Sequence, residues 1–456
     1  MEYYSTNGKA PIADLEKAVV KGLAEDRGLY MPSYINQLPK AFFDDMGQMS
    51  FRDIAYNVAN AFFGEDIDAD GLQDLVYETL SFDCPVVKIK DHVYALELFH
   101  GPTLAFKDVG ARFMARLLQY FIKRQSAATG RKQLVNVLVA TSGDTGSAVA
   151  NGFLGVDGIH VYVLYPKGKV SPIQECQFTT LGKNITAVEV DGVFDDCQAL
   201  VKNAFMDEEL NAKMKLTSAN SINVARFLPQ AFYYFNAVAR ISNSLNVSCA
   251  DMAKSLVICV PSGNFGNICA ALFGHAMGMP VKRFIAANNA NDIFFNYLKT
   301  GHYEPKPSKQ TLANAMDVGD PSNFARIINL YSQNNALTPE KTHQRITSLI
   351  SGAAYSDEQI METMRKCYSE TGYVLDPHGA CGYRAIEEGL TEGEIGVFCE
   401  TAHPAKFKEK VDDILGIDTT IPERLAAFMR GEKKNISISK EFTEFKTLLL
   451  NQPQHL

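Results

Sequence analysis

The stretch Glu97-Leu98-Phe99-His100-Gly101-Pro102-Thr103-Leu104-Ala105-Phe106-Lys107-Asp108 leads into a strongly periodic segment of the chain. That segment repeats apolar residues four positions apart, at Val109, Phe113, Leu117 and Phe121. This spacing predicts a helix with one face packed inward. Asp108 in the first turn suits the positive end of the helix dipole. Lys107 is then a cation at the positive end of a helix, flanked by apolar groups.

Both features of this position disfavour the ammonium form of Lys107 and lower its pKa. An amine with a depressed pKa is what a Schiff base with an aldehyde cofactor requires. The alternative is an ordinary lysine at a helix start, with its ammonium group in water. The stretch alone leaves both interpretations open.

Length and composition limit the class of protein. A chain of 456 residues is too long for one core, so two or three domains are expected. A net charge of -8 and a pI near 5.7 argue against a nucleic-acid partner. No segment has the uninterrupted apolar length of a membrane helix, and the N-terminus lacks the features of a signal peptide. The nine cysteines include no CxxC pair, which favours reduced thiols and a cytoplasmic protein.

The first part of the chain differs in pattern from the rest. Residues 1–92 are predicted to form a mainly helical domain without a catalytic constellation. From about residue 133, short apolar runs alternate with helical stretches, which predicts an α/β fold with a parallel sheet. Residues 311–375 are expected to be largely helical, and the tail from 405 to be amphipathic helix and loop. The buried strands are predicted at 134–140, 160–165, 185–190, 255–260, 281–286 and 396–399.

Ligands of open parallel sheets bind where strands end and helices begin, and two such junctions here are rich in small residues. The first is Ser262-Gly263-Asn264-Phe265-Gly266-Asn267, whose glycines and following helix predict an anion cradle. It lacks the Lys-Ser/Thr of a nucleotide P-loop, so a small phosphate fits it better. The alternative is a tight strand-to-helix turn without a ligand.

The second junction is Thr141-Ser142-Gly143-Asp144-Thr145-Gly146. It could hold a substrate carboxylate on backbone N–H groups and on Ser142 and Thr145. Helix capping by Asp144 or Thr145 explains the same residues.

Two polar clusters follow later in the chain, at 375–380 and 399–404. Thr401 would lie at the carboxyl end of a strand, where a hydroxyl could meet a pyridine nitrogen. The same clusters support a rival zinc site, because their spacings suit a metal. We expect no metal there, because the pairs do not form compact knuckles. The zinc candidates are His378, Cys381, Cys399 and His403.

These motifs together resemble the threonine synthase family, pyridoxal 5'-phosphate (PLP) enzymes of the tryptophan-synthase-β fold, fold type II. The matching segments occur in the family's order and span nearly the whole chain: GLAEDRGLYMP (22–32), FHGPTLAFKD (99–108), ATSGDTGSA (140–148), NSINVARFLPQ (220–230), VPSGNFGN (260–267), LDPHGA (375–380) and ETAHPAKF (400–407). The resemblance implies an N-terminal domain, residues 1–92, and a catalytic domain, residues 93–456. The catalytic domain would have a smaller lobe at about 133–215 and a larger lobe at about 93–132 and 216–456.

The resemblance also implies the roles of the cofactor-binding residues. Lys107 would be the catalytic Schiff-base lysine, and Thr401 would face the pyridine nitrogen. The phosphate of PLP would be held by Gly263, Asn264, Phe265, Gly266 and Asn267. The implied reaction is lysis of O-phospho-L-homoserine with water to L-threonine and phosphate, the last step of threonine biosynthesis.

The substrate is expected to meet the 141–146 turn through Ser142, Asp144 and Thr145, of which Asp144 suits an ammonium or a hydroxyl. The candidates for its phosphate are His100, Arg112, Asn151, Asn223 and Arg226. A phospho-lyase that releases a 2-keto acid is the nearest rival. A non-catalytic binding protein on the same fold is another. We expect a monomer or a homodimer.

Overall fold

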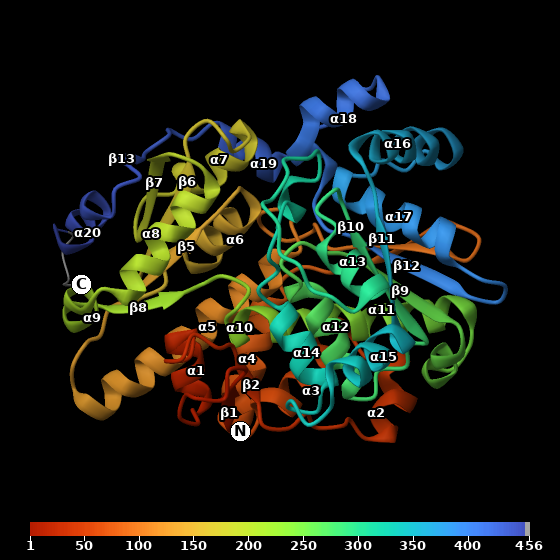
Figure 1. The fold of residues 1–456 in the computed structure, drawn as a ribbon, viewed down its shortest axis with the longest axis horizontal. Coiled ribbons are helices and arrows are strands. Elements are labelled where there is room, and N and C mark those ends of the chain that lie inside the picture. Colours follow the sequence, from red (N-terminus) through yellow and green to blue (C-terminus); the bar gives the residue numbers. More distant parts are fainter. Residues whose placement is uncertain (452–456) are drawn as a thin grey trace.

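Two open sheets organise residues 1–451, which are the residues described by the computed structural model (Figure 1). One sheet has six strands and the other has five, and helices cover both. The N-terminal segment lies beside them, at the bottom of Figure 1. The α/β fold with two sheet-centred lobes and a mainly helical N-terminal domain is therefore confirmed.

The N-terminal segment is helical, as predicted, apart from a two-stranded antiparallel ribbon. Its longer helices begin at side chains that accept a backbone N–H: Asp14, Ser50 and Asp68. The elements are β1 (Tyr3–Ser5), α1 (Leu15–Lys21), β2 (Tyr30–Pro32), α2 (Lys40–Asp45), η1 (Met46–Gln48), α3 (Phe51–Phe63) and α4 (Ala69–Thr79).

The six-stranded sheet has the order β11-β10-β9-β12-β4-β3. Its neighbours pair in parallel, except β3, which is antiparallel to β4. The strands are β3 (Val86–Lys90), β4 (Val93–Glu97), β9 (Leu256–Pro261), β10 (Arg283–Asn288), β11 (Ile350–Ala354) and β12 (Ile395–Glu400). Apolar residues make up most of β9, β10 and β12, as expected for strands covered on both faces.

The helices of this larger lobe include α11, which is buried along most of its length. They are α5 (Lys107–Thr129), α10 (Val224–Phe227), η2 (Leu228–Gln230), α11 (Ala231–Leu245), η3 (Cys249–Lys254), α12 (Gly266–Ala276), α13 (Ile293–Thr300), η4 (Asn314–Met316), α14 (Phe324–Tyr331), α15 (Pro339–Leu349), α16 (Asp357–Thr371), α17 (Pro377–Gly389), η5 (Pro404–Phe407) and α18 (Lys408–Leu415).

The five-stranded sheet is parallel throughout, with the order β13-β7-β6-β5-β8. Its strands are β5 (Val135–Ala140), β6 (Ile159–Pro166), β7 (Ile185–Asp191), β8 (Lys215–Ser218) and β13 (Ile436–Ser439). The accompanying helices are α6 (Asp144–Phe153), α7 (Pro172–Thr179), α8 (Phe194–Met206), α9 (Glu208–Lys213), α19 (Glu423–Met429) and α20 (Phe442–Asn451).

The end of the chain departs from the predicted lobe boundaries. We expected 216–456 in the larger lobe and the tail to lack strands, yet β13 joins the smaller sheet beside β7. Phe445 of α20 is buried in the same apolar cluster as Leu200 of α8, which fixes the tail to this lobe. The four-residue β13 is too short for alternation to reveal it. Likewise β11 lies within 311–375, which the pattern predicted as largely helical.

None of the helices in residues 1–451 combines the length and apolar character that crossing a bilayer requires.

Candidate active site

Four loops carry the predicted site residues, and each follows the carboxyl end of a strand. The loop after β4 leads to Lys107, and the loop after β9 contains Gly263. The loop after β12 begins at Thr401, and β12 lies in parallel between β4 and β9. The fourth loop follows β5 in the other sheet and contains Asp144. The topology therefore gathers the three loops of the larger sheet at one edge.

Lys107 is the first residue of α5, as the sequence predicted. The pKa of its amine is lowered to about 8, chiefly by burial; Asp144 opposes the shift, and the charges of Lys406 and Arg226 add to it. No hydrogen bond or ion pair of the amine is found within residues 1–451. Its Nζ lies 5.3 Å from the centre of the Phe106 ring. The neutral fraction of this amine at physiological pH is therefore far larger than that of an ordinary lysine, and no hydrogen-bonding partner among the described residues holds it.

The loop before Lys107 is held in a strained shape. Leu104 has φ +59°, in the left-handed region that branched side chains avoid. The carboxylate of Asp108 accepts bonds from the Thr103 N–H at 2.9 Å and the Thr103 hydroxyl at 2.6 Å, which closes the loop. The Phe106 N–H donates to the Thr401 carbonyl at 2.9 Å. Lys107 and Thr401 therefore sit on adjoining loops, and no partner of the Thr401 hydroxyl is found within residues 1–451.

The turn from Gly263 to Asn267 has the form of an anion cradle. Its five consecutive backbone N–H groups find no acceptor within residues 1–451. The last two open helix α12, whose dipole also favours an anion. Phe265 has φ +64°, which turns the chain into the helix. Five unpaired amides at a helix start match the acceptors of a phosphate group.

Two side chains stabilise the cradle from behind. The Ser262 hydroxyl donates to Asn267 Oδ1 at 2.8 Å, and Asn267 Nδ2 donates to the Pro261 carbonyl at 2.8 Å. A Cβ on Gly263 would come within 2.8 Å of the Ala315 carbonyl oxygen. Glycine is therefore required there by close approach of the 314–316 turn. Asn264 and Asn267 use their side chains for this framework and leave their N–H groups for a ligand.

The Thr141–Gly146 turn forms a second, smaller cradle. The Thr141 hydroxyl accepts the Gly143 and Gly146 N–H groups, at 2.9 and 2.8 Å. The N–H groups and hydroxyls of Ser142 and Thr145 have no partner within residues 1–451. The predicted alternative of capping by Asp144 or Thr145 is wrong, because the N-cap of α6 is Gly143 without a side-chain bond. The free donors suit a carboxylate.

Asp144 forms a buried ion pair with Lys406, a residue that the sequence did not single out. Lys406 Nζ lies 2.6 Å from Asp144 Oδ1, and it also donates to the Thr103 carbonyl at 2.8 Å. Gln174 donates to the same carboxylate at 2.9 Å. Burial alone would raise the pKa of Asp144, but Lys406 and Lys107 hold it well below its usual range. This contact joins the two lobes directly beside Lys107.

The other candidates for the substrate phosphate already bond to backbone carbonyls or to acids. Arg112 donates to the Thr79 and Glu78 carbonyls, at 3.0 and 2.7 Å. Asn223 donates to the Val19 carbonyl at 2.9 Å, and Asn151 to Ser147 and Gln177 at 2.9 Å each. The remaining two differ in exposure.

Arg226 is buried, and its Nε has no partner within residues 1–451 although Nη1 donates to the Ala219 carbonyl. His100 is half-buried and lies 2.7 Å from the Glu97 carboxylate. Arg226 is thus the candidate with a free buried donor.

The residues proposed for the rival zinc site contact different partners and are not grouped as metal ligands would be. His378 Nδ1 lies 2.5 Å from Asp376, and its Nε2 accepts the Ala315 N–H at 3.1 Å. His403 Nδ1 accepts the Ala405 N–H, and burial lowers the pKa of His403 to about 4. Cys399 lies 3.9 Å from the Tyr234 hydroxyl. Within residues 1–451 no three His, Cys, Asp or Glu side chains are grouped to bind a metal.

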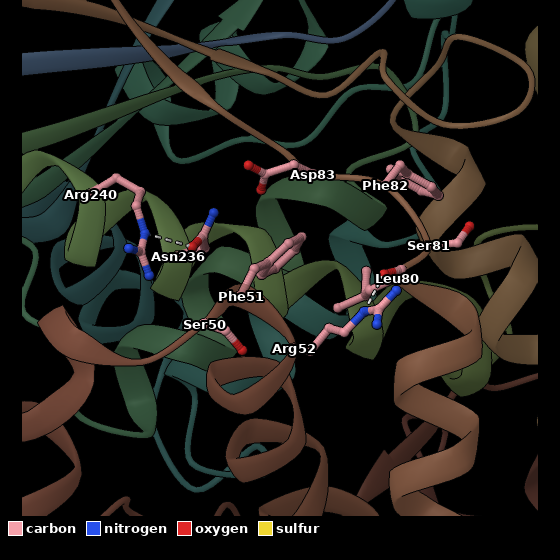
Figure 2. A pocket seen from close by; sticks show the side chains of 9 residues that line it. All are labelled: Ser50, Phe51, Arg52, Leu80, Ser81, Phe82, Asp83, Asn236 and Arg240. Atoms are coloured by element: carbon pink, nitrogen blue, oxygen red, sulfur yellow. Dashed lines mark hydrogen bonds between the residues drawn. The ribbon is translucent and has the colours of Figure 1, made fainter.

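A separate hollow lies between the N-terminal segment and α11 (Figure 2). Figure 2 shows Arg52 and Arg240 on its two sides, with Asp83 above them. Both arginines bond to backbone carbonyls, Arg52 to Leu80 and Arg240 to Met49. None of the predicted site residues lines this hollow. It is distinct from the candidate active site.

The features of the larger site fit PLP. The open amides of the 263–267 turn match a phosphate, the unpaired amine of Lys107 matches an aldehyde, and the Thr401 hydroxyl is free for a ring nitrogen. A Cβ at Gly263 would fill the space that the adjoining turn already occupies. The fit rests on polar groups that the part of the chain described by the structure leaves without a partner.

Comparisons with known proteins agree with this site. A family model described as "Pyridoxal-phosphate dependent enzyme" matches residues 78–399. The models "Threonine synthase N terminus" and "Threonine synthase, C-terminal" match residues 2–80 and 379–448. Threonine synthase from Serratia marcescens is 42% identical over 455 residues, covering 99% of this chain and 100% of the relative.

Solved structures show the same architecture. The crystal structure of threonine synthase from Escherichia coli has a TM-score of 0.89 and 40% identity, and it covers 99% of this chain and 100% of that one. The PLP-bound threonine synthase from Brucella melitensis has a TM-score of 0.90 and 33% identity, with 98% of each chain covered.

Proposed function

The chain belongs to the threonine synthase family of PLP-dependent enzymes, and we propose that it converts O-phospho-L-homoserine and water to L-threonine and phosphate. The observation that carries the proposal is that the unpaired amine of Lys107 and the open phosphate cradle at 263–267 follow parallel strands of one sheet and lie at the same edge. The enzyme is a lyase of threonine biosynthesis with PLP as its cofactor.

Three parts of the chain would hold the cofactor. Lys107 supplies the amine for its aldehyde, and Gly263, Asn264, Phe265, Gly266 and Asn267 supply amides for its phosphate. The Thr401 hydroxyl is the partner for its ring nitrogen. A neutral hydroxyl leaves the ring less electron-withdrawing than a carboxylate would. When bound, PLP acts as an electron sink for carbanion chemistry at the substrate Cα.

Lys107 is the residue that moves protons. Burial lowers the pKa of its amine, so that the neutral form is available to take the proton from the substrate Cα. The same amine can then transfer protons at Cβ and Cγ while phosphate departs from Cγ and water adds at Cβ. Reuse of one base needs a pKa near the operating pH, which a value of about 8 provides.

The substrate has a carboxylate, an ammonium and a phosphate, and the site has matching groups. The free amides and hydroxyls of Ser142 and Thr145 suit its carboxylate, and Asp144 suits its ammonium. Arg226, with its unpaired buried Nε, supports the proposal for the phosphate. The proposed roles of the other candidates remain predictions, because each would have to exchange its present hydrogen bonds for contacts with the substrate phosphate. These candidates are His100, Arg112, Asn151 and Asn223.

The test uses Lys107→Ala in the full chain. We expect loss of turnover and of covalent cofactor attachment, measured by borohydride treatment and peptide mapping. A variant that keeps either one refutes the role of Lys107. Supplying wild-type enzyme with O-phospho-L-homoserine and assaying both threonine and 2-oxobutanoate distinguishes the proposed reaction from that of a phospho-lyase.

The remaining assignments concern setting and partners. We propose a cytoplasmic enzyme that is a monomer or a homodimer and has no nucleic-acid partner. The acidic net charge of -8 argues against a nucleic-acid partner, and the nine unpaired cysteines support a reducing compartment.

A further inference from the structure

Arg326 is a fully buried cation whose partners are all neutral. Its Nη1 donates to Asn323 Oδ1 at 2.6 Å, and its Nε and Nη2 donate to the Tyr30 carbonyl at 3.2 and 3.0 Å. Nη2 also donates to the Ile222 carbonyl, and the guanidinium lies 4.2 Å from the centre of the Phe227 ring. No carboxylate within residues 1–451 forms an ion pair with Arg326.

An isolated charge in a protein interior is expensive unless an opposite charge compensates for it. Lys406, another deeply buried cation near the active site, has such a partner in Asp144. Burial lowers the pKa of Arg326 only to about 10, so the guanidinium stays charged at neutral pH. The positive charge of Arg326 is therefore not compensated within the described part of the protein, and a negatively charged ligand nearby would compensate for it.

Asn323 connects Arg326 to the phosphate cradle. Its Nδ2 donates to the Asn264 carbonyl at 3.0 Å, and the neighbouring Ser322 N–H donates to Asn264 Oδ1 at 2.7 Å. Asn264 Nδ2 in turn donates to the Ser221 hydroxyl at 2.8 Å. Its own backbone N–H is then the one polar atom of Asn264 without a partner in residues 1–451. Two hydrogen bonds, both made by the Asn323 side chain, therefore connect Arg326 to Asn264.

Such a chain has an electrostatic consequence. A cation on Asn323 Oδ1 polarises its amide, so that Nδ2 becomes a stronger donor to the Asn264 carbonyl. Withdrawal of electron density from that carbonyl strengthens the hydrogen bonds that the cradle makes to an anion. The same guanidinium binds the Tyr30 carbonyl of β2, so the N-terminal segment takes part in the arrangement.

We propose that Arg326 is a positioning residue and the counter-charge for the phosphate group bound at the 263–267 turn, acting through Asn323. This inference rests on the proposed cofactor site and extends it to a residue that does not touch the ligand. It also assigns a role to β2, which contributes the Tyr30 carbonyl that orients the guanidinium.

The experiment compares two aldehydes that differ only in the phosphate. The full chain is freed of cofactor, and calorimetry measures its Kd for pyridoxal 5'-phosphate and for pyridoxal. For Arg326→Met we expect roughly 10- to 100-fold weaker binding of pyridoxal 5'-phosphate, since a charge-assisted interaction is lost. Binding of pyridoxal should change by less than about threefold, because its contacts avoid the cradle. Arg326→Lys should recover part of the selectivity.

Arg240→Met is the matched control. Arg240, which lines the separate hollow of Figure 2, also bonds across to a carbonyl of the N-terminal segment, that of Met49, and within residues 1–451 it has no hydrogen bond to the cradle. Its replacement should leave the preference for the phosphorylated aldehyde unchanged. Equal loss of both aldehydes in Arg326→Met, or no loss, overturns the inference.

A second variant tests the proposal independently, in case Arg326→Met does not fold. Asn323→Asp keeps the side-chain shape and places a carboxylate beside the guanidinium, which satisfies the cation internally. We expect it to weaken binding of pyridoxal 5'-phosphate selectively, and unchanged selectivity contradicts the proposal. Failure of wild-type protein to bind pyridoxal 5'-phosphate would instead refute the cofactor assignment and this inference with it.

Discussion

Lys406 Nζ lies 2.6 Å from Asp144 Oδ1, and the two side chains are 0% and 4% exposed. One comes from η5 in the larger lobe and the other from the first turn of α6 in the smaller lobe. Each also influences Lys107: Asp144 raises the pKa of that amine and Lys406 lowers it. The pair therefore balances the charge around the proposed catalytic base.

Removing Lys406 should disturb this balance. In Lys406→Met, Asp144 becomes a buried carboxylate with Lys107 as its remaining cation, so Lys107 should stay protonated and turnover should fall roughly 100-fold or more. Measured pH profiles should show the acidic limb of kcat, which reports deprotonation of the base, moving to higher pH. The double variant Lys406→Met/Asp144→Asn should recover part of the loss.

Lys408→Met is the control for this prediction, because Lys408 pairs with Asp412 and Asp418 nearer the surface. It should leave kcat unchanged. An unshifted pH profile in Lys406→Met would show that the ion pair does not govern Lys107.

Lys107 should titrate far below other lysines in protein freed of cofactor. Its pKa of about 8 predicts that labelling by an amine reagent has its midpoint near that pH, whereas ordinary lysines titrate near 10.4. Peptide mapping by mass spectrometry across a pH series measures the midpoint, and a short lysine peptide provides the comparison. Equal midpoints would contradict the depressed pKa.

The same shift predicts how stability depends on pH. The folded pKa lies below the unfolded one, so between about pH 8 and 10.4 the unfolded chain binds more protons at Lys107. The contribution of this group to stability is therefore unfavourable below about pH 8 and improves as the pH rises through the interval. Lys107→Met should remove that part of the dependence in urea unfolding experiments.

Gly263 should tolerate no side chain. A Cβ there would lie 2.8 Å from the Ala315 oxygen and 2.8 Å from the Met316 Cα, both backbone atoms that cannot move independently. Gly263→Ala should therefore weaken binding of pyridoxal 5'-phosphate by roughly tenfold or more, as measured by calorimetry.

Gly266→Ala offers a comparison in the same turn, since its Cβ would meet the Ser221 Cβ at 3.0 Å, a side-chain atom. Its effect on the Kd should be smaller. The reverse order would show that the 314–316 turn does not restrain the cradle.

Glu394 should be important for acid stability. Its nearly buried carboxylate accepts bonds from Arg283, at 2.9 Å from Nε and 2.5 Å from Nη2, and pairs with Lys282 at 2.9 Å. Arg283 in particular holds the pKa of Glu394 well below its usual range. The resulting stability is present above the unfolded pKa of about 4.3 and is lost as the pH falls toward the folded value.

Glu394→Gln should lower the free energy of unfolding at pH 7 by about 2 to 3 kcal/mol, less than for a fully buried pair because Lys282 is partly exposed. Urea unfolding measures the change. Glu423→Gln removes an exposed partner of Arg430 and should match the wild type. A Glu394→Gln chain as stable as that control would exclude a structural role for the Glu394 contacts.

Much of the fold was predictable from local pattern. Runs such as Leu134–Ala140 and Gly396–Cys399 appear as β5 and β12, because a buried parallel strand needs a continuous apolar sequence. β3 and β4 were missed, because the pattern of residues 1–92 is mainly helical up to the point where the chain enters the sheet. β13 was missed because its pairing partner β7 lies more than 240 residues earlier, between 185 and 191.

The site was predictable to a similar degree. Lys107 and the 262–267 turn carry local signals, namely a helix start and glycines that release backbone amides. Lys406 carried none, because a lysine becomes informative only when its carboxylate partner is known. Arg326 likewise stands in an ordinary amphipathic helix.

The sequence by itself determined the strand-turn-helix junctions, because apolar period, helix capping and glycine act over a few neighbouring residues. The tertiary structure alone decided which charges share the interior: Lys406 with Asp144, and Arg326 with neutral carbonyls beside the phosphate cradle. The physical reason is that burial and Coulomb interaction depend on distances in space, and these bring together residues hundreds of positions apart in the chain.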